Sequence, residues 1–251
     1  MTGPISIIRT GYPDEPGVDT ALSRAMLQRT SRGTLPESFR LFTPGRVVAF
    51  GKRDTLEPGY PAAVAATRAG GFVPITRIAG GRAAVFHEGT LAFGWTVPAE
   101  TPRAGVGSRF AAVAGIMADA LRTLGIDARI GEVRGEYCPG RWSVNAGGLT
   151  KLMGVGQRLD RHAAHVGGVV VVDNRTAVNE ILTPVYEALG ISWRPEATGA
   201  VQDHRPDVAP GEVADAILAT IAERRTLIDA TLDSGLLAEA RQLAGEHATV
   251  L

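Results

Sequence analysis

One cysteine and one lysine carry the clearest chemistry in this sequence. Cys138 is the only cysteine among 251 residues and lies in the Gly/Pro-rich stretch GEYCPGRW. Lys151 follows thirteen positions later, inside a second glycine-rich stretch. A turn can present a thiol to a substrate, and a nearby ammonium stabilises the thiolate, which is the nucleophilic form. A free cysteine is also commonly a small buried hydrophobe, so a catalytic role and a packing role both remain open.

Paired glycines mark a second candidate region, the stretch RIAGGRAAVFHEG. Gly80 and Gly81 lie between two expected strands, where they permit unusual backbone conformations and let a ligand lie against the main chain. Arg77 and Arg82 flank the glycines and His87 closes the following strand, so the segment could receive an anionic or polar head group. A plain Gly-Gly hairpin with two solvated arginines explains the pattern equally well.

The residues around Lys151 and the histidines do not match the patterns of several well-known phosphate-, dinucleotide- and metal-binding sites. The stretch around Lys151, GGLTKLMGVGQR, is neither a phosphate-binding GxxxxGK[ST] loop nor a GxGxxG dinucleotide fingerprint. A strand lysine there could reach a carbonyl or phosphate oxygen, or be a surface lysine. His165 precedes a β-branched run and could position a substrate or cap the strand. His162 lies three residues earlier, but no further ligand has metal-site spacing, so we expect no metal site.

Composition narrows the class of protein. The chain has 26 Lys+Arg and 26 Asp+Glu residues, so no basic excess favours binding to nucleic acid. Hydrophobic residues make up 45% of the chain, enough for a sizeable core. A single cysteine excludes an intramolecular disulfide and fits a reducing compartment. No apolar run approaches the ~20 residues of a membrane span, and the N-terminus lacks a signal-peptide pattern. We therefore expect a cytoplasmic protein without a membrane or nucleic-acid partner.

The hydrophobic pattern predicts short strands interleaved with helices. Strands are expected at residues 5–9, 39–42, 46–50, 73–77, 82–86, 90–97, 127–133, 142–146, 149–153, 155–160 and 166–172. Helices are expected at residues 18–28, 58–70, 110–124, 176–189 (capped by Asn174), 212–224 and 227–244. Hairpin turns are predicted at Thr43-Pro44-Gly45 and at Gly147-Gly148.

This order of elements predicts an α+β fold with a central mixed, mainly antiparallel sheet flanked by helices. Residues 1–195 are expected to form the main domain, and residues 195–210 a linker. Residues 210–251 are expected to form a short C-terminal helical tail.

Three ordered segments resemble the lipoate-protein ligase and octanoyltransferase family, relatives of the biotin protein ligase catalytic domain. RIAGGRAAVFHEG looks like the family's acyl-binding RxxGG(x)AVxH segment, KLMGVGQR like its Lys-x-x-Gly-x-(Ala/Gly/Ser)-Gln-Arg segment, and HVGGVVVV like its His-x-Gly strand. The resemblance runs over roughly residues 5–190 and implies that residues 1–195 are an acyl-transfer catalytic domain. It implies acyl- or substrate-binding roles for Arg77, Gly80, Gly81, Arg82, His87, Gly154, Gln157 and His165.

Within that family, GEYCPGRWSVN resembles the CPG loop of the cysteine-dependent octanoyl transferases. The resemblance implies that Cys138 attacks an acyl thioester or acyl-lysine amide and holds the octanoyl or lipoyl group as a thioester. The acyl group then passes to a lysine of a lipoyl carrier domain, either the glycine-cleavage H protein or a 2-oxoacid dehydrogenase E2. Lys151 would align the carbonyl and stabilise the tetrahedral intermediate. Acyl carrier protein is one candidate donor, the sequence leaves the donor open, and transfer is expected to need no cofactor.

Two other functions are considered. An ATP-dependent lipoate ligase, which would require ATP and Mg²⁺, would make Cys138 incidental. A catalytically silent acyl- or carrier-binding protein is disfavoured because Cys138 and Lys151 are both present. The sequence departs from many ligases at Arg82, where they continue with Gly or Ala. Its tail is shorter than the accessory domain of full-length ligases, which favours a transferase.

Overall fold

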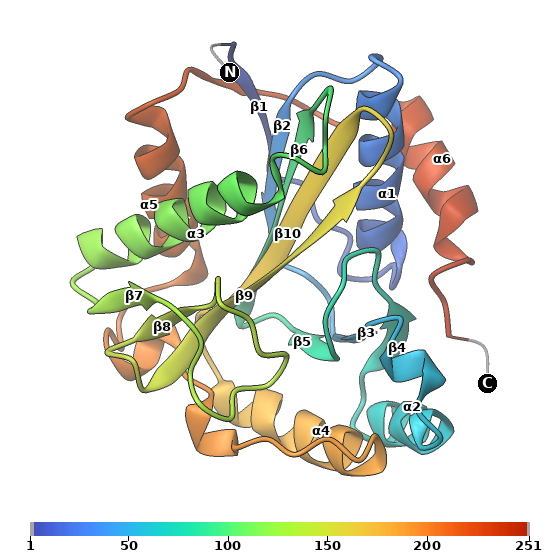
Figure 1. The fold of residues 1–251 in the computed structure, drawn as a ribbon, viewed down its shortest axis with the longest axis vertical. Coiled ribbons are helices and arrows are strands. Elements are labelled where there is room, and N and C mark those ends of the chain that lie inside the picture. Colours follow the sequence, from blue (N-terminus) through green and yellow to red (C-terminus); the bar gives the residue numbers. More distant parts are fainter. Residues whose placement is uncertain (1–2, 250–251) are drawn as a thin grey trace.

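The computed structural model describes residues 3–249, in which helices enclose two β-sheets (Figure 1). The large sheet contains β1 (Ile5–Ile8), β2 (Ser38–Phe42), β6 (Thr90–Pro98), β7 (Ala128–Ile130), β8 (Val144–Ala146), β9 (Thr150–Leu159), β10 (Ala163–Val171) and β11 (Leu227–Asp229). The small sheet contains β3 (Val47–Phe50), β4 (Val73–Thr76) and β5 (Ala84–Phe86). The α-helices are α1 (Val18–Ser31), α2 (Tyr60–Ala69), α3 (Val106–Thr123), α4 (Arg175–Ala188), α5 (Pro210–Ala222) and α6 (Ser234–Ala244). Three short 3₁₀ turns are η1 (Asp54–Leu56), η2 (Pro195–Ala197) and η3 (Val201–Asp203).

The large sheet is mixed and mainly antiparallel, which confirms the predicted fold class. Its strand order is β11-β1-β2-β6-β10-β9-β8-β7. The β11–β1 and β1–β2 pairs are parallel, and the remaining neighbours are antiparallel. The β-branched run that ends β10 is fully buried, as expected for a strand covered on both faces.

Helices cover the sheets in three pairs (Figure 1). Helices α3 and α5 pack together on one face of the large sheet, where their apolar side chains join its main core. Helices α1 and α6 pack together on the other side, around Leu22 and Leu236. Helices α2 and α4 pack together beneath the small sheet and complete a second core. The Asn174 side chain accepts a hydrogen bond from the backbone N–H of Ala177 at 3.1 Å, confirming the predicted cap of α4.

Two long loops meet at the junction of the sheets. The first, residues 77–83, leads from β4 to β5, which lie on opposite sides of β3 rather than forming a hairpin. The second, residues 131–143, joins β7 to β8. The predicted Gly147-Gly148 hairpin is confirmed, since β8 and β9 pair directly across it. This pairing places Lys151 directly beneath the second loop.

Three local predictions are corrected by the structure. The Thr43-Pro44-Gly45 turn does not join a hairpin, because β2 lies in the large sheet and β3 in the small one. Residues 155–160 do not start a new strand, because β9 continues from Thr150 to Leu159. Residues 227–229 are a strand rather than part of a helix, because β1 offers a free edge for parallel pairing.

The C-terminal region is closely packed. Residues 195–210, expected as a linker, form η2 and η3 and bury Ala200 and Val201. Beyond them α6 is tied to α1 by Arg29, which contacts Asp233 at 2.9 Å and Glu239 at 2.8 Å. The division into a domain of residues 1–195 and a tail of residues 210–251 stays a prediction. No helix within residues 3–249 combines the length and apolar character needed to cross a membrane.

Candidate active site

A buried carboxylate organises the loop that carries the cysteine. Glu136 is 3% exposed and its side chain faces inward from the loop. One oxygen accepts hydrogen bonds from the Gly140 N–H at 3.1 Å and the Ser143 hydroxyl at 2.6 Å. The other oxygen accepts from the Val133 N–H at 3.0 Å. Glu136 therefore ties the start and the end of the loop together around the residues between them.

Lys151 holds the same loop from below. Its ammonium is fully buried and donates to Glu136 Oε1 at 3.0 Å, to the carbonyl of Tyr137 at 2.9 Å and to the carbonyl of Cys138 at 2.9 Å. These three bonds use all the donors of a lysine side chain. The positive charge thus lies next to the cysteine while its hydrogen bonds fix the loop. Gly154 leaves room for this side chain, since a Cβ there would lie 3.2 Å from Lys151 Cε.

Cys138 has an unusual backbone and a doubly hydrogen-bonded sulfur. Its φ of +43° lies in the left-handed region, which costs a non-glycine residue ~1–3 kcal/mol and is commonly found at functional sites. Its Sγ accepts hydrogen bonds from the Arg82 backbone N–H at 3.2 Å and from Arg77 Nη2 at 3.3 Å. Burial raises the pKa of the thiol, but Arg77, Lys151 and the hydrogen bonds lower it, and the net shift is downward.

The loop of residues 77–83 presents main-chain and arginine donors to this sulfur. Gly81 has φ +114°, and a Cβ there would lie 1.9 Å from Arg77 Nη2 and 2.8 Å from Cys138 Sγ. A glycine is thus required for the approach of Arg77 to the sulfur. The Arg82 side chain turns away, donating to Asp54 at 3.1 Å and Glu57 at 2.8 Å. This anchor leaves the Arg82 N–H directed at the thiol.

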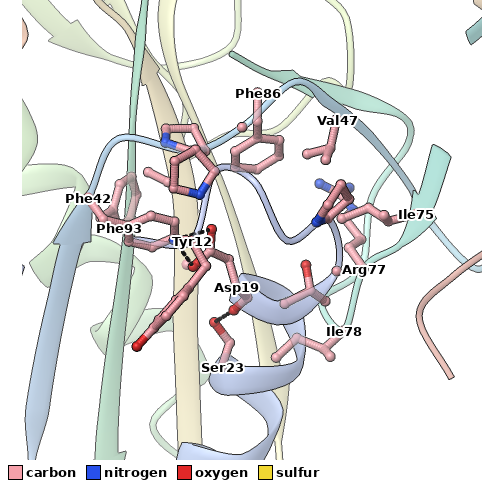
Figure 2. Close-up of a pocket in the computed structure, with 18 of the residues that line it drawn as sticks. Tyr12, Asp19, Ser23, Phe42, Val47, Ile75, Arg77, Ile78, Phe86 and Phe93 are labelled. Atoms are coloured by element: carbon pink, nitrogen blue, oxygen red, sulfur yellow. Dashed lines mark hydrogen bonds between the residues drawn. The ribbon is translucent and has the colours of Figure 1, made fainter. Parts of the chain in front are cut away.

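An apolar cavity lies beside Arg77, at the junction of the two sheets (Figure 2). Its apolar walls come from both sheets and from the loop that follows β4, and include Phe42, Val47, Ile75, Ile78, Phe86 and Phe93. Its volume is about 110 Å³, whereas one water molecule needs only ~10–15 Å³ on the same measure. The cavity can therefore hold an extended apolar chain, with the Arg77 guanidinium beside it.

The wall of the cavity formed by helix α1 is polar. Figure 2 shows Asp19 and Ser23 on this helix, directed toward the cavity. Asp19 forms an ion pair with the buried Arg40 and accepts a hydrogen bond from the Tyr12 N–H at 3.2 Å. Burial lowers the pKa of Arg40, and the neighbouring Asp19 opposes the shift. The paired charges give the apolar cavity one polar wall without an isolated buried charge.

Cys138 itself lines a cleft beside the 77–83 loop. The cleft is lined by Gly80, Gly81, Val106, Phe110, Cys138, Pro139, Val155, Gly156, Gln157 and Leu159. Gly80 and Gly81 are exposed and form one rim, so a substrate could approach the sulfur along the main chain. Gln157 accepts a hydrogen bond from Arg109 Nε at 2.9 Å.

The two histidines singled out by the sequence occupy different places. His165 lines the apolar cavity and is hydrogen-bonded through Nδ1 to the Thr96 hydroxyl at 2.9 Å. Burial, assisted by Arg40, lowers the pKa of His165 to about 4, so the ring is neutral at pH 7. His87 is buried behind β5, where its Nδ1 accepts from the Gly89 N–H at 3.0 Å. It is not among the residues that line the cavity or the cleft.

The structure adds two residues that the sequence did not single out. Glu136 is one, and its place two positions before the cysteine was the only available signal. Tyr186 on α4 is the other: its Oη accepts from the Cys138 N–H at 2.8 Å and donates to the Ala83 carbonyl at 3.0 Å. No group of three His, Cys, Asp or Glu side chains suited to a metal ion occurs within residues 3–249.

Comparisons with known proteins agree with the resemblance of the motifs. The chain is 28% identical over 168 residues to the octanoyl-[GcvH]:protein N-octanoyltransferase of Geobacillus kaustophilus (strain HTA426), covering 66% of this chain and 59% of that protein. This alignment spans less than two thirds of the relative's length. The protein of the same name from Bacillus velezensis (strain DSM 23117 / BGSC 10A6 / LMG 26770 / FZB42) is 23% identical over 239 residues, covering 91% of this chain and 83% of that one.

Solved structures share the fold. A crystal structure of lipoate-protein ligase A bound with ATP matches with a TM-score of 0.79 and 19% identity, covering 98% of this chain and 95% of that one. The bi-partite lipoate protein ligase of Thermoplasma acidophilum, described with its E2 lipoyl domain, matches with a TM-score of 0.76 and 18% identity, covering 97% and 93%. The family model of the lipoyl protein ligase A/B catalytic domain matches residues 15–222. The chain therefore belongs to the lipoyl protein ligase A/B catalytic-domain family.

Proposed function

We propose that this protein transfers an octanoyl or lipoyl group to a lysine of a lipoyl carrier domain through a thioester on Cys138. The observation that carries the proposal is the Cys138 sulfur, which accepts two hydrogen bonds at the rim of a cleft. One of its donors, Arg77, also lines the apolar cavity. An acyl chain in that cavity would bring its carbonyl to Arg77 and hence to the sulfur.

The first step forms the thioester. The Cys138 thiolate attacks the carbonyl carbon of the donor, a C–S bond forms, and the carbonyl oxygen becomes an oxyanion. The Arg82 N–H and the Arg77 guanidinium, which hold the thiolate beforehand, are the donors next to this oxygen. Collapse of the intermediate breaks the bond to the leaving group, which departs as a thiolate or, after its nitrogen takes a proton from solvent, as a lysine amine.

The second step regenerates the thiolate. The neutral ε-amine of the acceptor lysine attacks the thioester carbonyl, a C–N bond forms, and the C–S bond breaks. The amine loses one proton to solvent, and the sulfur leaves as the thiolate that its hydrogen bonds already favour. No nucleotide, metal or redox partner enters either step.

Carrier domains are the proposed partners. The two relatives bear the name octanoyl-[GcvH]:protein N-octanoyltransferase, and a fold neighbour is described with an E2 lipoyl domain. By similarity, we propose an octanoylated glycine-cleavage H protein as donor and the lipoyl domain of an E2 as acceptor. Octanoyl-acyl carrier protein is a second candidate donor, because its thioester can be attacked by the same thiolate.

One observation favours a second candidate function, an ATP-dependent lipoate ligase. A groove beside Gly80 is lined by the cations Arg24, Lys52, Arg77 and Arg158 and by one acid, Asp160. Lysine and arginine side chains suit phosphate groups, so these residues would fit a nucleotide. ATP would activate a free acid as an adenylate there, and Cys138 would not be needed.

Intact-mass analysis separates the two functions. The wild-type protein and its Cys138→Ala variant are incubated with octanoylated H protein, with octanoyl-acyl carrier protein, or with lipoate, ATP and Mg²⁺, each with an acceptor lipoyl domain. We expect an octanoyl adduct on the wild-type protein, an acylated acceptor, and neither product with Cys138→Ala. A Cys138→Ala protein that acylates its acceptor from lipoate and ATP at the wild-type rate would overturn the transferase and establish the ligase.

A further inference from the structure

One tyrosine hydroxyl connects the two loops that form the cysteine site. Tyr186 lies on α4 and is fully buried, in the second core beneath the small sheet. Its Oη accepts the Cys138 N–H at 2.8 Å from one loop and donates to the Ala83 carbonyl at 3.0 Å on the other. Since Ala83 follows Arg82, only the peptide group between these two residues separates the carbonyl bonded to the hydroxyl from the N–H that donates to the sulfur.

These contacts close a ring. The Cys138 N–H is bonded to Tyr186, Tyr186 is bonded to the Ala83 carbonyl, and the Arg82 N–H is bonded back to Cys138 Sγ. The ring contains the one strained torsion of the site, the φ of +43° at Cys138. Removing the hydroxyl would leave a buried N–H and a buried carbonyl without this partner, so the loop gains from relaxing away from the left-handed conformation.

We propose that Tyr186 is a positioning residue for acyl transfer, whose hydroxyl holds the Cys138 sulfur against its donors Arg82 and Arg77. This inference rests on the proposed function of Cys138. Tyr186 acts through the cysteine backbone and makes no contact with substrate, because its side chain is fully buried. The hydroxyl is suited to this task because burial and the nearby Cys138 charge raise the pKa of Tyr186 well above its usual value. It therefore remains a donor to Ala83 over the pH range in which the Cys138 thiol loses its proton.

The chain provides a matched control one residue from the cysteine. The ring of Tyr137 packs against Trp193 at 6.3 Å between centroids, and the ring of Tyr186 packs against the same side chain at 5.4 Å. Within residues 3–249 the Tyr137 hydroxyl is buried and has no hydrogen-bond partner. Tyr186→Phe and Tyr137→Phe thus each remove one buried oxygen beside Trp193, and only the first removes hydrogen bonds to the cysteine loop.

Two measurements on the full-length protein test the proposal. The rate of Cys138 alkylation by iodoacetamide as a function of pH gives the pH at which the thiolate forms, without any substrate. Octanoyl transfer from octanoylated H protein gives kcat and KM. For Tyr186→Phe we expect the alkylation midpoint to move to higher pH, because the sulfur moves away from Arg77 and Arg82. We expect kcat to fall about tenfold, the scale of losing the hydrogen bond between the hydroxyl and the Cys138 N–H, with KM unchanged. Tyr137→Phe should match the wild-type protein in all three quantities.

The outcomes are distinguishable. A Tyr186→Phe protein with the wild-type midpoint and kcat overturns the proposal, and so does one in which only KM rises. A loss equal in Tyr137→Phe and Tyr186→Phe also overturns it, because it reports packing on Trp193 instead of hydrogen bonding. Measurements are made well below the unfolding temperature of each variant. If Cys138→Ala retains transfer activity, the proposed function fails, whereas the alkylation midpoints still decide whether Tyr186 positions the thiol.

Discussion

Arg77 Nη2 lies 3.3 Å from Cys138 Sγ, although the two residues are 61 positions apart. Arg77 follows the last residue of β4, and its N–H is bonded to the Phe50 carbonyl at 3.0 Å, which anchors its backbone to the small sheet. Its guanidinium also lines the apolar cavity. One side chain therefore connects the space suited to an acyl chain with the sulfur that would receive its carbonyl.

The Arg77→Gln variant should raise the pKa of the Cys138 thiol. In the folded protein burial raises this pKa, and Arg77 is the largest opposing influence. Without the guanidinium, alkylation of Cys138 at pH 7 should slow by up to about tenfold, the effect of one pKa unit. The pH dependence of octanoyl transfer should likewise shift toward higher pH. Arg82→Lys is the control variant, because it keeps the positive charge near Asp54 and the backbone N–H that donates to the sulfur. It should change the pH dependence of alkylation and activity less than Arg77→Gln does.

Gly81→Ala should disable the site more than Gly80→Ala. A Cβ at Gly81 would collide with Arg77 Nη2 at 1.9 Å, and its φ of +114° disfavours alanine whatever the space. A Cβ at Gly80 would meet nothing within 4 Å. Thiol reactivity and octanoyl transfer should both fall in Gly81→Ala, while the free energy of unfolding falls by ~1–3 kcal/mol. Equal effects of the two substitutions would mean that the glycines act by flexibility alone.

Local sequence signals predicted the positions of helices and strands better than they predicted which strands pair with one another. The Gly147-Gly148 hairpin was predictable because both glycines adopt positive φ, +61° and +80°, as a tight hairpin turn requires. Thr43-Pro44-Gly45 offers a similar local signal, yet the chain crosses there from the large sheet to the small one. The choice of partner depends on burial of β2 in the centre of the large sheet, which neighbouring residues do not encode. The strand at Leu227–Asp229 likewise exists because of β1, more than two hundred residues earlier.

The candidate active site was also only partly predictable from local sequence signals. Cys138, Lys151 and the Gly80-Gly81 pair were found because rare residue types and glycine clusters stand out along the chain. The structure places all of these within two facing loops and the strand beneath them. Tyr186 gave no signal, because in its own helix it has the spacing of an ordinary core residue. Its bonds reach residues 48 and 103 positions away, and only the tertiary fold brings these together.

Lys151→Met should reduce both stability and turnover, and a second substitution should separate the two effects. The variant leaves the buried Glu136 carboxylate without its cation, and breaking a buried pair costs ~3–5 kcal/mol. Turnover should fall by at least about tenfold, the effect of one pKa unit, because the Lys151 charge lowers the pKa of the Cys138 thiol and its hydrogen bonds hold the cysteine loop. In Glu136→Gln/Lys151→Met the uncompensated charge is gone, so urea denaturation should show part of the stability restored, while turnover stays low. Near-wild-type turnover in Lys151→Met would show that Lys151 has a purely structural role.

His165 should make the protein less stable as the pH falls from 6.5 to 4. Burial lowers the pKa of His165 from 6.5 to about 4 in the folded state. Between these values the unfolded chain binds a proton that the folded chain does not, so lowering the pH favours unfolding. Above pH 6.5 the ring is neutral in both states, so His165 does not lower the free energy of unfolding. Below pH 6.5 the free energy of unfolding decreases, and the loss due to His165 is about 3 kcal/mol near pH 4. The neighbouring Arg40 acts in the same direction, because its charge opposes protonation of the ring.

The His165→Asn variant isolates this contribution. Asparagine can keep a hydrogen bond to the Thr96 hydroxyl but does not titrate. His87 and His247, whose pKa values burial also lowers, remain in both proteins, so their contributions cancel in the comparison. Urea denaturation at pH 7 and at pH 4.5 should give a smaller loss of unfolding free energy for His165→Asn than for the wild-type protein. Identical losses would show that the His165 ring takes up its proton in the folded protein as readily as in the unfolded chain.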